Sequence, residues 1–238
     1  MTAQLHLGEI SVDLVFKDIK NVHLSVHPPT GRVRISAPER MAIDKIRIFA
    51  ISKLDWIKRH QTGFRNQERE TPREYLDRES HYLWGRRYLL RIHEMDAPPE
   101  LWLSPGKMHL VVRPSTREDK KREIIAEFYR EQVRAEAPPL MEKWGRLLGV
   151  AVDRLYVRQM KTKWGTCNPR ARSIRLNTEL AKKPKHCLEY IVVHEMVHFL
   201  ERHHGNRFVS LMDTFMPEWR LYRDELNRHP LPHETWQF

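Results

Sequence analysis

Cysteine is scarce in this sequence, with only Cys167 and Cys187 among 238 residues. Two cysteines are too few for a disulfide framework or for a zinc ribbon built on four cysteines. A chain of this length can bury a sizeable core without such crosslinks. We therefore expect a globular protein in which the two thiols serve only in packing.

Long apolar stretches are also missing. Charged residues make up 31% of the chain, and no apolar run approaches the roughly 18 residues that a membrane-spanning helix requires. The first residues, MTAQLHLGEISVDLVF, lack the basic region, apolar stretch and small-residue cleavage site of a secretory signal. We expect a cytoplasmic protein that does not act with a membrane.

Positive charge is abundant, because the formal net charge is +11. This excess predicts anionic partners, whether an anionic substrate, a nucleotide or nucleic acid, or an acidic protein surface. Residues 154–185 hold ten basic side chains against one acidic one, Glu179. The excess therefore lies directly before the histidine motif described below, and we expect a substrate that is negatively charged or carries phosphate. The oligomeric state is not set by the sequence.

The first half of the chain is rich in short runs of β-forming residues. A PPTG turn stands at residues 28–31, and apolar residues recur at helical spacing over residues 42–61. Residues 64–80 are strongly charged and read as a solvated connection. Strands are predicted at residues 10–16, 22–26, 32–36, 87–93 and 108–113, the first three as a small antiparallel sheet. Residues 1–115 are therefore interpreted as a β-rich N-terminal region with one covering helix.

Residues 116–238 form a second predicted region, which can still be continuous with the first. A long helical pattern covers residues 116–149, where Pro138-Pro139 should break or kink the helix. Strands at 152–160 and 172–177 flank KTKWGTCNPRA, which predicts a hairpin or bulged turn. No internal repeat is visible. The mixture of strands and helices predicts the α+β class.

His194-Glu195-Met196-Val197-His198 stands in an apolar segment that predicts a largely buried helix. Two histidines four residues apart lie about 6 Å apart on one helical face, so both imidazoles can reach one cation. Glu195 is about 100° around the helix from His194 and can take a proton from a water that the cation activates. The alternative is a helix with ordinary core histidines, but a carboxylate buried beside them would be costly without a cation.

A third ligand is predicted just downstream. On a continuous helix His204 would lie about 9 Å beyond His198 and roughly 240° around, so the helix must end between the two. Gly205 and Asn206 tolerate the left-handed conformation that such an ending uses. His203 is the rival third ligand, and Glu201 is a possible outer-shell or replacement ligand or else an exposed helical charge.

Taken together, Met160, Trp164-Gly165-Thr166-Cys167, Asn177, the H-E-x-x-H motif, His204 and Phe208 resemble the YgjP-like metallopeptidase family, which is related more distantly to the SprT-like zincins. The resemblance implies a zincin-like α+β core whose H-E-x-x-H helix packs on a small mixed or antiparallel sheet. It also implies one Zn²⁺ on three histidines and hydrolase activity. One bacterial branch of the family is associated with pyrophosphate cleavage of UTP.

The sequence departs from the pattern of these families at three positions. Thr166 stands where that family often has serine, which keeps the hydroxyl, and His203 stands where relatives commonly have asparagine. The spacing to His204 equals that of the metzincins, but Glu201 replaces their helix-ending glycine. Membership of the metzincins is therefore not expected.

A basic strip before the motif supplies the candidate substrate-binding residues Arg158, Lys161, Lys163 and Trp164. A cation beside the metal would stabilise an oxyanion in the transition state. The alternative is an ordinary solvent-facing strand for the three cations, and a core position for Trp164. Cys167 is a metal ligand only if His204 is not.

These observations predict a zinc-dependent metallohydrolase with His194, His198 and His204 as ligands and Glu195 as general base. Its substrate would be a peptide or an anion, with a UTP pyrophosphatase as the alternative reading. A hypothesis of another class is a nucleic-acid-binding protein with a structural metal. A structural zinc site would be closed by a fourth protein ligand, whereas three histidines leave a position open.

Overall fold

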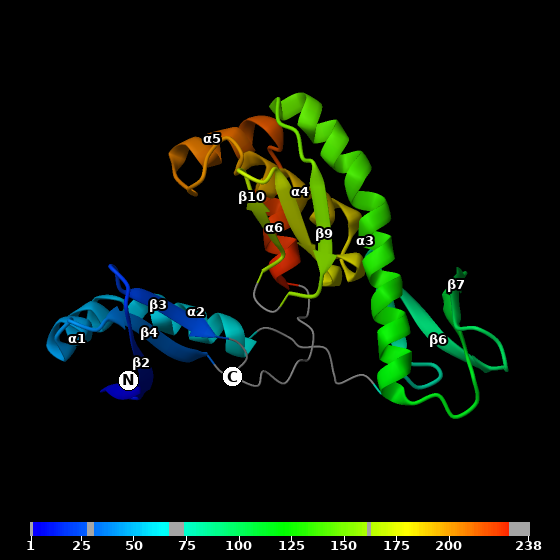
Figure 1. Ribbon diagram of the computed structural model, residues 1–238, viewed down its shortest axis with the longest axis horizontal. Helices are drawn as coiled ribbons and strands as arrows, with labels where there is room; N and C mark the ends of the chain where they lie inside the picture. The colour runs from blue at the N-terminus through cyan, green and yellow to red at the C-terminus, as the bar shows by residue number, and fades with distance from the viewer. Residues whose placement is uncertain (1, 28–30, 67–73, 161–162, 229–238) are drawn as a thin grey trace. The chain divides into compact units, whose positions relative to one another are not determined.

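The computed structural model describes residues 2–27, 31–66, 74–160 and 163–228. Helices and small sheets alternate along the chain (Figure 1), which confirms the predicted α+β class. The chain divides near residue 70 into two compact units, called here the N-terminal unit and the C-terminal unit. None of the described helices has the length and apolar character that crossing a membrane would require.

The N-terminal unit is built on a four-stranded mixed sheet. Its strands are β1 Thr2–Leu7, β2 Ile10–Lys17, β3 His23–His27 and β4 Arg32–Pro38, in the order β1-β2-β4-β3. The prediction of a wholly antiparallel sheet is wrong, because β2 and β4 are parallel. After β2, the chain forms β3 at the edge of the sheet. It then reverses direction, and β4 lies between β3 and β2.

Two helices cover one face of this sheet instead of the single helix predicted for residues 42–61. They are α1 Ile43–Ser52 and α2 Leu54–Asn66, separated at Lys53, whose backbone N–H bonds to the carbonyl groups of Ala50 and Ile51. Ile46 and Ile57 are fully buried against the apolar face of the sheet. The periodicity therefore correctly predicted helical structure, but the segment contains two helices.

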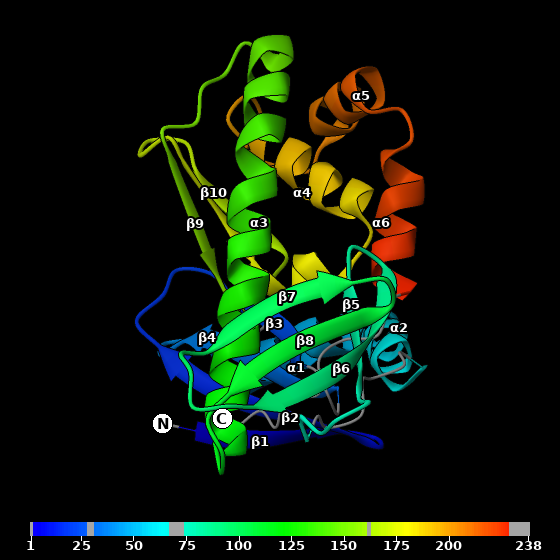
Figure 2. The ribbon, with the colours of Figure 1, turned by 90° about the vertical axis from the view of Figure 1, so that its right-hand side faces the viewer.

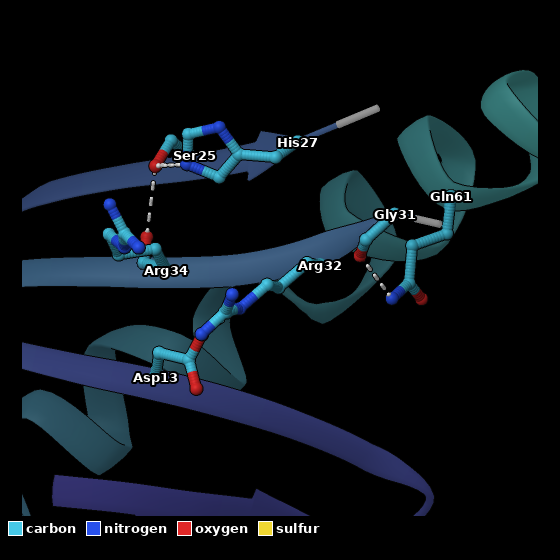
Figure 3. A network of polar contacts seen from close by, with 7 residues as sticks. All are labelled: Asp13, Ser25, His27, Gly31, Arg32, Arg34 and Gln61. Atoms are coloured by element: carbon cyan, nitrogen blue, oxygen red, sulfur yellow. Dashed lines mark hydrogen bonds and ion pairs between the residues drawn. The ribbon is translucent and has the colours of Figure 1, made fainter. Parts of the chain in front are cut away.

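The other face of the sheet carries a network of polar contacts (Figure 3). Arg32 on β4 pairs with Asp13 on β2. Ser25 hydrogen-bonds the His27 imidazole at 2.9 Å and donates to the Arg34 carbonyl at 3.3 Å. The Arg32–Asp13 and Ser25–Arg34 contacts join neighbouring strands and help to hold the register of β2, β3 and β4.

One further contact fixes α2 to the sheet. The Gln61 side-chain amide donates to the Gly31 carbonyl at 2.8 Å (Figure 3). Gly31 has φ +75°, and a Cβ there would lie 2.8 Å from Gln61 Cγ. Glycine is therefore required both by the backbone conformation and by the approach of the helix.

The C-terminal unit begins with a sheet of the same topology. Its strands are β5 Ser80–Leu83, β6 Arg86–Glu94, β7 Glu100–Ser104 and β8 Lys107–Val112, in the order β5-β6-β8-β7. As in the first sheet, the outer pairs are antiparallel and the central pair is parallel. The structure thus contains a repeated four-stranded motif that the sequence analysis missed.

A long helix, α3 Glu118–Leu148, covers one face of this second sheet (Figure 2). Of the break or kink predicted at Pro138-Pro139, the break is wrong, since the helix continues through both prolines. Val133 and Ala137 before them and Trp144 after them are buried in one core. This packing outweighs the lost helical hydrogen bonds. The second sheet and α3 share a core and lie together in the unit that starts near residue 70.

The remaining elements surround the histidine motif. Strands β9 Arg154–Arg158, β10 Gly165–Asn168 and β11 Ser173–Asn177 form a sheet in the order β10-β11-β9. It is followed by the 3₁₀ helix η1 Thr178–Lys182 and by α4 Lys185–Val197, α5 Asn206–Phe215 and α6 Trp219–Arg228. The hairpin or bulged turn predicted between the strands at 152–160 and 172–177 is wrong, because β9 and β11 are parallel. Within the predicted connection, β10 forms an additional strand that pairs antiparallel with β11. Helix α4 packs between this sheet and α3.

The prolines of α3 provide a test of the fold. Both are solvent-exposed, and each removes a backbone donor from the helix interior. We expect Pro138→Ala and Pro139→Ala each to raise the free energy of unfolding by about 1–2 kcal/mol, because relieving the ~3 kcal/mol cost of a proline inside a helix outweighs the ~1 kcal/mol lost when the unfolded chain becomes less restricted. Urea denaturation measures this difference. A loss of stability in both variants would contradict the continuous helix.

Candidate metal centre

Helix α4 holds the histidine motif in the core. Pro184 precedes its first turn with φ −53°, which is pre-set for a helix start. Leu188, Val192 and Val193 are fully buried, as expected for a helix surrounded by protein. His194 and Glu195 lie in the last turn, and His198 is the C-cap residue. The side chains of the motif are therefore fixed by a rigid, packed element.

Three imidazoles converge beyond the end of α4. His204 Nε2 lies 3.0 Å from His194 Nε2 and 3.1 Å from His198 Nε2. One ring nitrogen from each residue lies within 4.8 Å of the other two. Phe208 on α5 packs against all three rings, with centroid distances of 4.7–5.0 Å. The three nitrogens are thus close enough to share one cation.

The chain between His198 and His204 turns away from the helix, as the spacing predicted. The prediction that Gly205 supplies a left-handed ending is wrong, since its φ is −83° and it is the N-cap residue of α5. His203 is exposed, and its backbone N–H donates to the Glu201 carboxylate at 3.2 Å. Among the described residues, His204 and not His203 joins the other two imidazoles. Glu201 caps this turn.

The protonation of the rings suits metal binding. His198 Nδ1 lies 3.0 Å from the Glu201 carbonyl oxygen, which can only accept, so Nδ1 carries the proton and Nε2 has a free lone pair. Burial, followed by the neighbouring His198 and His204, lowers the pKa of His194 to about 3. Burial also lowers the pKa of His198. Neutral imidazoles with converging Nε2 atoms are a donor set that fits Zn²⁺.

Glu195 lies beside the three histidines and is only 6% exposed. Burial raises its pKa to about 7, while Lys163 and a hydrogen bond from the Cys167 thiol oppose the rise. A carboxylate with a pKa near neutrality is well matched to general base catalysis at physiological pH.

Gly165 on β10 makes room for this carboxylate. A Cβ at Gly165 would lie 2.7 Å from Glu195 Oε1 and 2.8 Å from Ile191 Cγ2. Any side chain here would push Glu195 out of place or displace the strand from α4. The Trp-Gly pair therefore has a steric role that the sequence alone did not reveal.

Asn177 organises the loop that leads to β10. It is 4% exposed, and its side-chain amide donates to the carbonyls of Met160 at 2.8 Å and Lys163 at 2.9 Å. Its Oδ1 accepts from the backbone N–H of Glu179 and so caps η1. One buried side chain thus connects the loop, the strand and the start of η1.

The motif faces a cleft of about 1060 Å³ that is lined by β10, the end of α4 and part of α6. Lys163 and Trp164, two of the four candidate substrate-binding residues, line this cleft, and Trp164 is half-buried. Arg158 is not among the lining residues and lies on β9, at the opposite edge of the sheet from β10. Lys161 falls outside the described residues. Cys167 lines the cleft and contacts Glu195, and burial raises its thiol pKa to about 11.

Several cleft residues were missed in the sequence. Tyr190 stands one helical turn before His194, with its ring edge-on to that imidazole at 5.8 Å. Its spacing on the same helical face was an available signal. Arg170, Arg202 and Arg223 also line the cleft. The last two come from segments far from the basic strip, so no local pattern would have identified them.

Three comparisons with known proteins gave the following results. The family model of the YgjP-like metallopeptidase domain matches residues 20–229. No curated protein matches the chain. Two solved structures of metallopeptidase zymogens are similar. Jannalysin of Methanocaldococcus jannaschii is 18% identical, with 38% of this chain and 87% of that chain covered and a TM-score of 0.35. Abylysin of Pyrococcus abyssi is 19% identical, with 40% and 99% covered and a TM-score of 0.35.

Asn177 gives a prediction about the integrity of the site. We expect Asn177→Ala to lower the free energy of unfolding by about 2–4 kcal/mol, because several buried backbone groups lose their partner. Asn168→Ala is the matched control, since Asn168 is exposed and its amide oxygen accepts only the nearby Ala171 N–H at 3.1 Å. Urea denaturation of both variants measures the difference, and equal losses would show that Asn177 has no special role.

Proposed function

Because the chain belongs to the YgjP-like metallopeptidase family and is therefore a metallohydrolase, we propose that it uses one Zn²⁺ held by His194, His198 and His204, with Glu195 as general base, to hydrolyse peptide bonds. The observation that carries this proposal is the convergence of three imidazole nitrogens beside a buried carboxylate. Three protein ligands leave one coordination position open, which is typical of catalytic and not of structural zinc.

The roles of the chain's own groups follow from their positions. Bound zinc supplies Lewis acidity, which lowers the pKa of a water molecule and polarises a substrate carbonyl. Glu195 accepts the proton of the attacking water and can return it to the leaving amine. The burial that raises the pKa of Glu195 to about 7 favours both transfers. Tyr190 and the cations of the cleft wall lie where they can stabilise negative charge on the substrate.

A peptide substrate is favoured by the edge strand β10. Gly165 to Asn168 line the cleft, and among the described strands β10 pairs only with β11. An extended peptide can add to such an edge through backbone hydrogen bonds while its side chains enter neighbouring pockets. This would place a peptide carbonyl next to Glu195, which lies against Gly165.

A phosphoanhydride such as that of UTP is the second candidate, because Lys163, Arg170, Arg202 and Arg223 make the cleft wall basic. Incubating the zinc-loaded protein with unfolded peptides and, separately, with UTP distinguishes the two. Peptide cleavage without pyrophosphate release supports the first proposal, and the opposite result supports the second. A nucleic-acid-binding protein with a purely structural metal would show neither.

Metal binding tests the ligand assignment. We expect His204→Ala to weaken zinc binding by more than about 100-fold, since even changes outside the ligand shell cost about 10–100-fold. His203→Ala is the matched control, because that neighbouring histidine is exposed and is not among the described residues that converge on the site, and it should retain zinc. Competition with a chelating dye measures both affinities. Loss of zinc in His203→Ala alone would reverse the assignment.

The general base is tested by Glu195→Gln, which keeps the shape of the side chain but cannot accept a proton. We expect zinc content to be unchanged and hydrolysis to fall by about 10²–10⁴-fold. Glu201→Gln is the control, because its amide oxygen can still accept the His203 N–H and it lies outside the cleft. Full activity in Glu195→Gln would remove this residue from the mechanism.

A further inference from the structure

The second sheet has an open face away from the metal centre. Leu90, Met108 and Leu110 point into the core against α3, so the alternate residues of β6 and β8 lie on the opposite face. Figure 2 shows the strands β6, β8 and β7 in front of α3, with no described helix over that face. We name this surface the platform and define it by Arg87, Arg91, His93, Trp102, Lys107 and His109.

Three aromatic rings gather on the platform. His93 Nε2 and His109 Nδ1 are 2.9 Å apart, and the two ring planes differ by 17°. The Trp102 indole is almost parallel to both, at 6° from His109 and 13° from His93, with centroids 5.0 and 5.7 Å away. Ser104 Oγ bonds the remaining nitrogen of His109 at 2.8 Å. Hydrogen bonds therefore hold the two imidazoles in one plane, and the indole stacks upon it.

The exposed indole is not required by the fold. The N-terminal sheet has the same topology, and strand register places Trp102 opposite His109 in one sheet and Ser25 opposite Arg34 in the other. The motif thus folds with a small polar side chain at this position. Trp102 is 40% exposed, and the imidazoles occupy only one of its two faces.

Basic side chains share this face of the sheet with the rings, together with the exposed acid Glu100 on β7. Arg91 is the register neighbour of His109 on one side, as Trp102 is on the other. Arg87 and Lys107 are exposed on the same face. Arg91 is paired with Asp77 at 3.0 Å, so the exposed cations are the better candidates for binding an anion. Burial and the nearby His93 and Lys107 lower the pKa of His109, which leaves its ring neutral for stacking.

We propose that the platform binds single-stranded nucleic acid, with a base stacked on Trp102 and backbone phosphates on Arg87 and Lys107. An exposed aromatic among cations on a four-stranded sheet matches the chemistry of an unpaired base next to its phosphate. A paired base in a duplex cannot offer its face to the indole. The net charge of +11 adds long-range attraction for a polyanion. The proposal does not depend on the metal centre or on hydrolysis.

Fluorescence anisotropy of a labelled single-stranded oligothymidylate of about 12 nucleotides, a length that one such site can cover, tests the platform in the full chain. We expect Trp102→Ala to weaken binding about tenfold and Trp102→Phe to retain most of it. Trp56→Ala is the matched control, because Trp56 is another exposed tryptophan, on α2. Thermal melts of each variant confirm that the exposed positions leave the fold intact.

The charge contribution has its own control. Arg87→Glu and Lys107→Glu should weaken binding and reduce its salt dependence, whereas Lys45→Glu, the same charge change on the exposed surface of α1, should not. Glu195→Gln should bind the oligonucleotide normally, so failure of the enzymatic proposal leaves this result unaffected. Equal affinity of Trp102→Ala and Trp56→Ala overturns the proposal. So does equal binding of a duplex, or self-association through this face without oligonucleotide binding.

Discussion

The architecture of the C-terminal unit depends on one constraint, which is that three imidazoles and a carboxylate must be held together at the end of a buried helix. Of these groups Glu195 is buried, His194 and His198 are partly buried and His204 is exposed, and burying polar groups is unfavourable unless they have partners. Helix α4 is surrounded by apolar contacts from α3 and the small sheet. On its outer side, Lys143 and Trp144 donate hydrogen bonds to the Glu189 carboxylate at 2.7 and 2.8 Å. The proposed zinc ion would neutralise the remaining cost.

The elements around α4 each fix one part of this arrangement. Gly165 gives Glu195 the space that a Cβ would fill, and Asn177 holds the loop before Gly165 through its buried amide. Phe208 on α5 packs against all three rings. The turn capped by Glu201 brings His204 back to the helix end. Residues spread over 44 positions of sequence, from Gly165 to Phe208, are thereby held at one site, as preorganised catalysis requires.

The sequence predicted the elements that follow from periodicity and from short-range stereochemistry. The i, i+4 spacing of His194 and His198 places both on one helical face wherever the helix lies, and the 240° argument showed that the helix must end before His204. Strand positions near residues 10–16, 32–36 and 172–177 were close to the observed ones. What failed depended on distant contacts. The prolines of α3 are tolerated because of core packing on both sides of them, and the parallel pairing of β2 with β4 depends on where β3 is placed.

In the cleft, too, local sequence predicted some residues and missed those brought in by distant elements. Lys163 and Trp164 were predicted because they precede the motif on a basic strip, but Arg158 on that strip lies at the far sheet edge, while Arg202 and Arg223 reach the cleft from other elements. The repeated four-stranded topology was invisible because the corresponding side chains differ, as Ser25 and Trp102 illustrate. Two sheets can share a backbone topology when their buried apolar positions follow the same pattern. The side chains on their exposed faces can then be different.

The central claim is that three histidine nitrogens bind one zinc ion and leave one coordination position open for an oxygen ligand such as water. An X-ray absorption spectrum of the full chain loaded with one equivalent of zinc tests it most directly. The account predicts scattering from three imidazoles and one oxygen, at about 2.0–2.1 Å, without sulfur. A sulfur neighbour at about 2.3 Å would identify Cys167 or Cys187 as a ligand, and a fourth imidazole would close the site; either result would contradict the account.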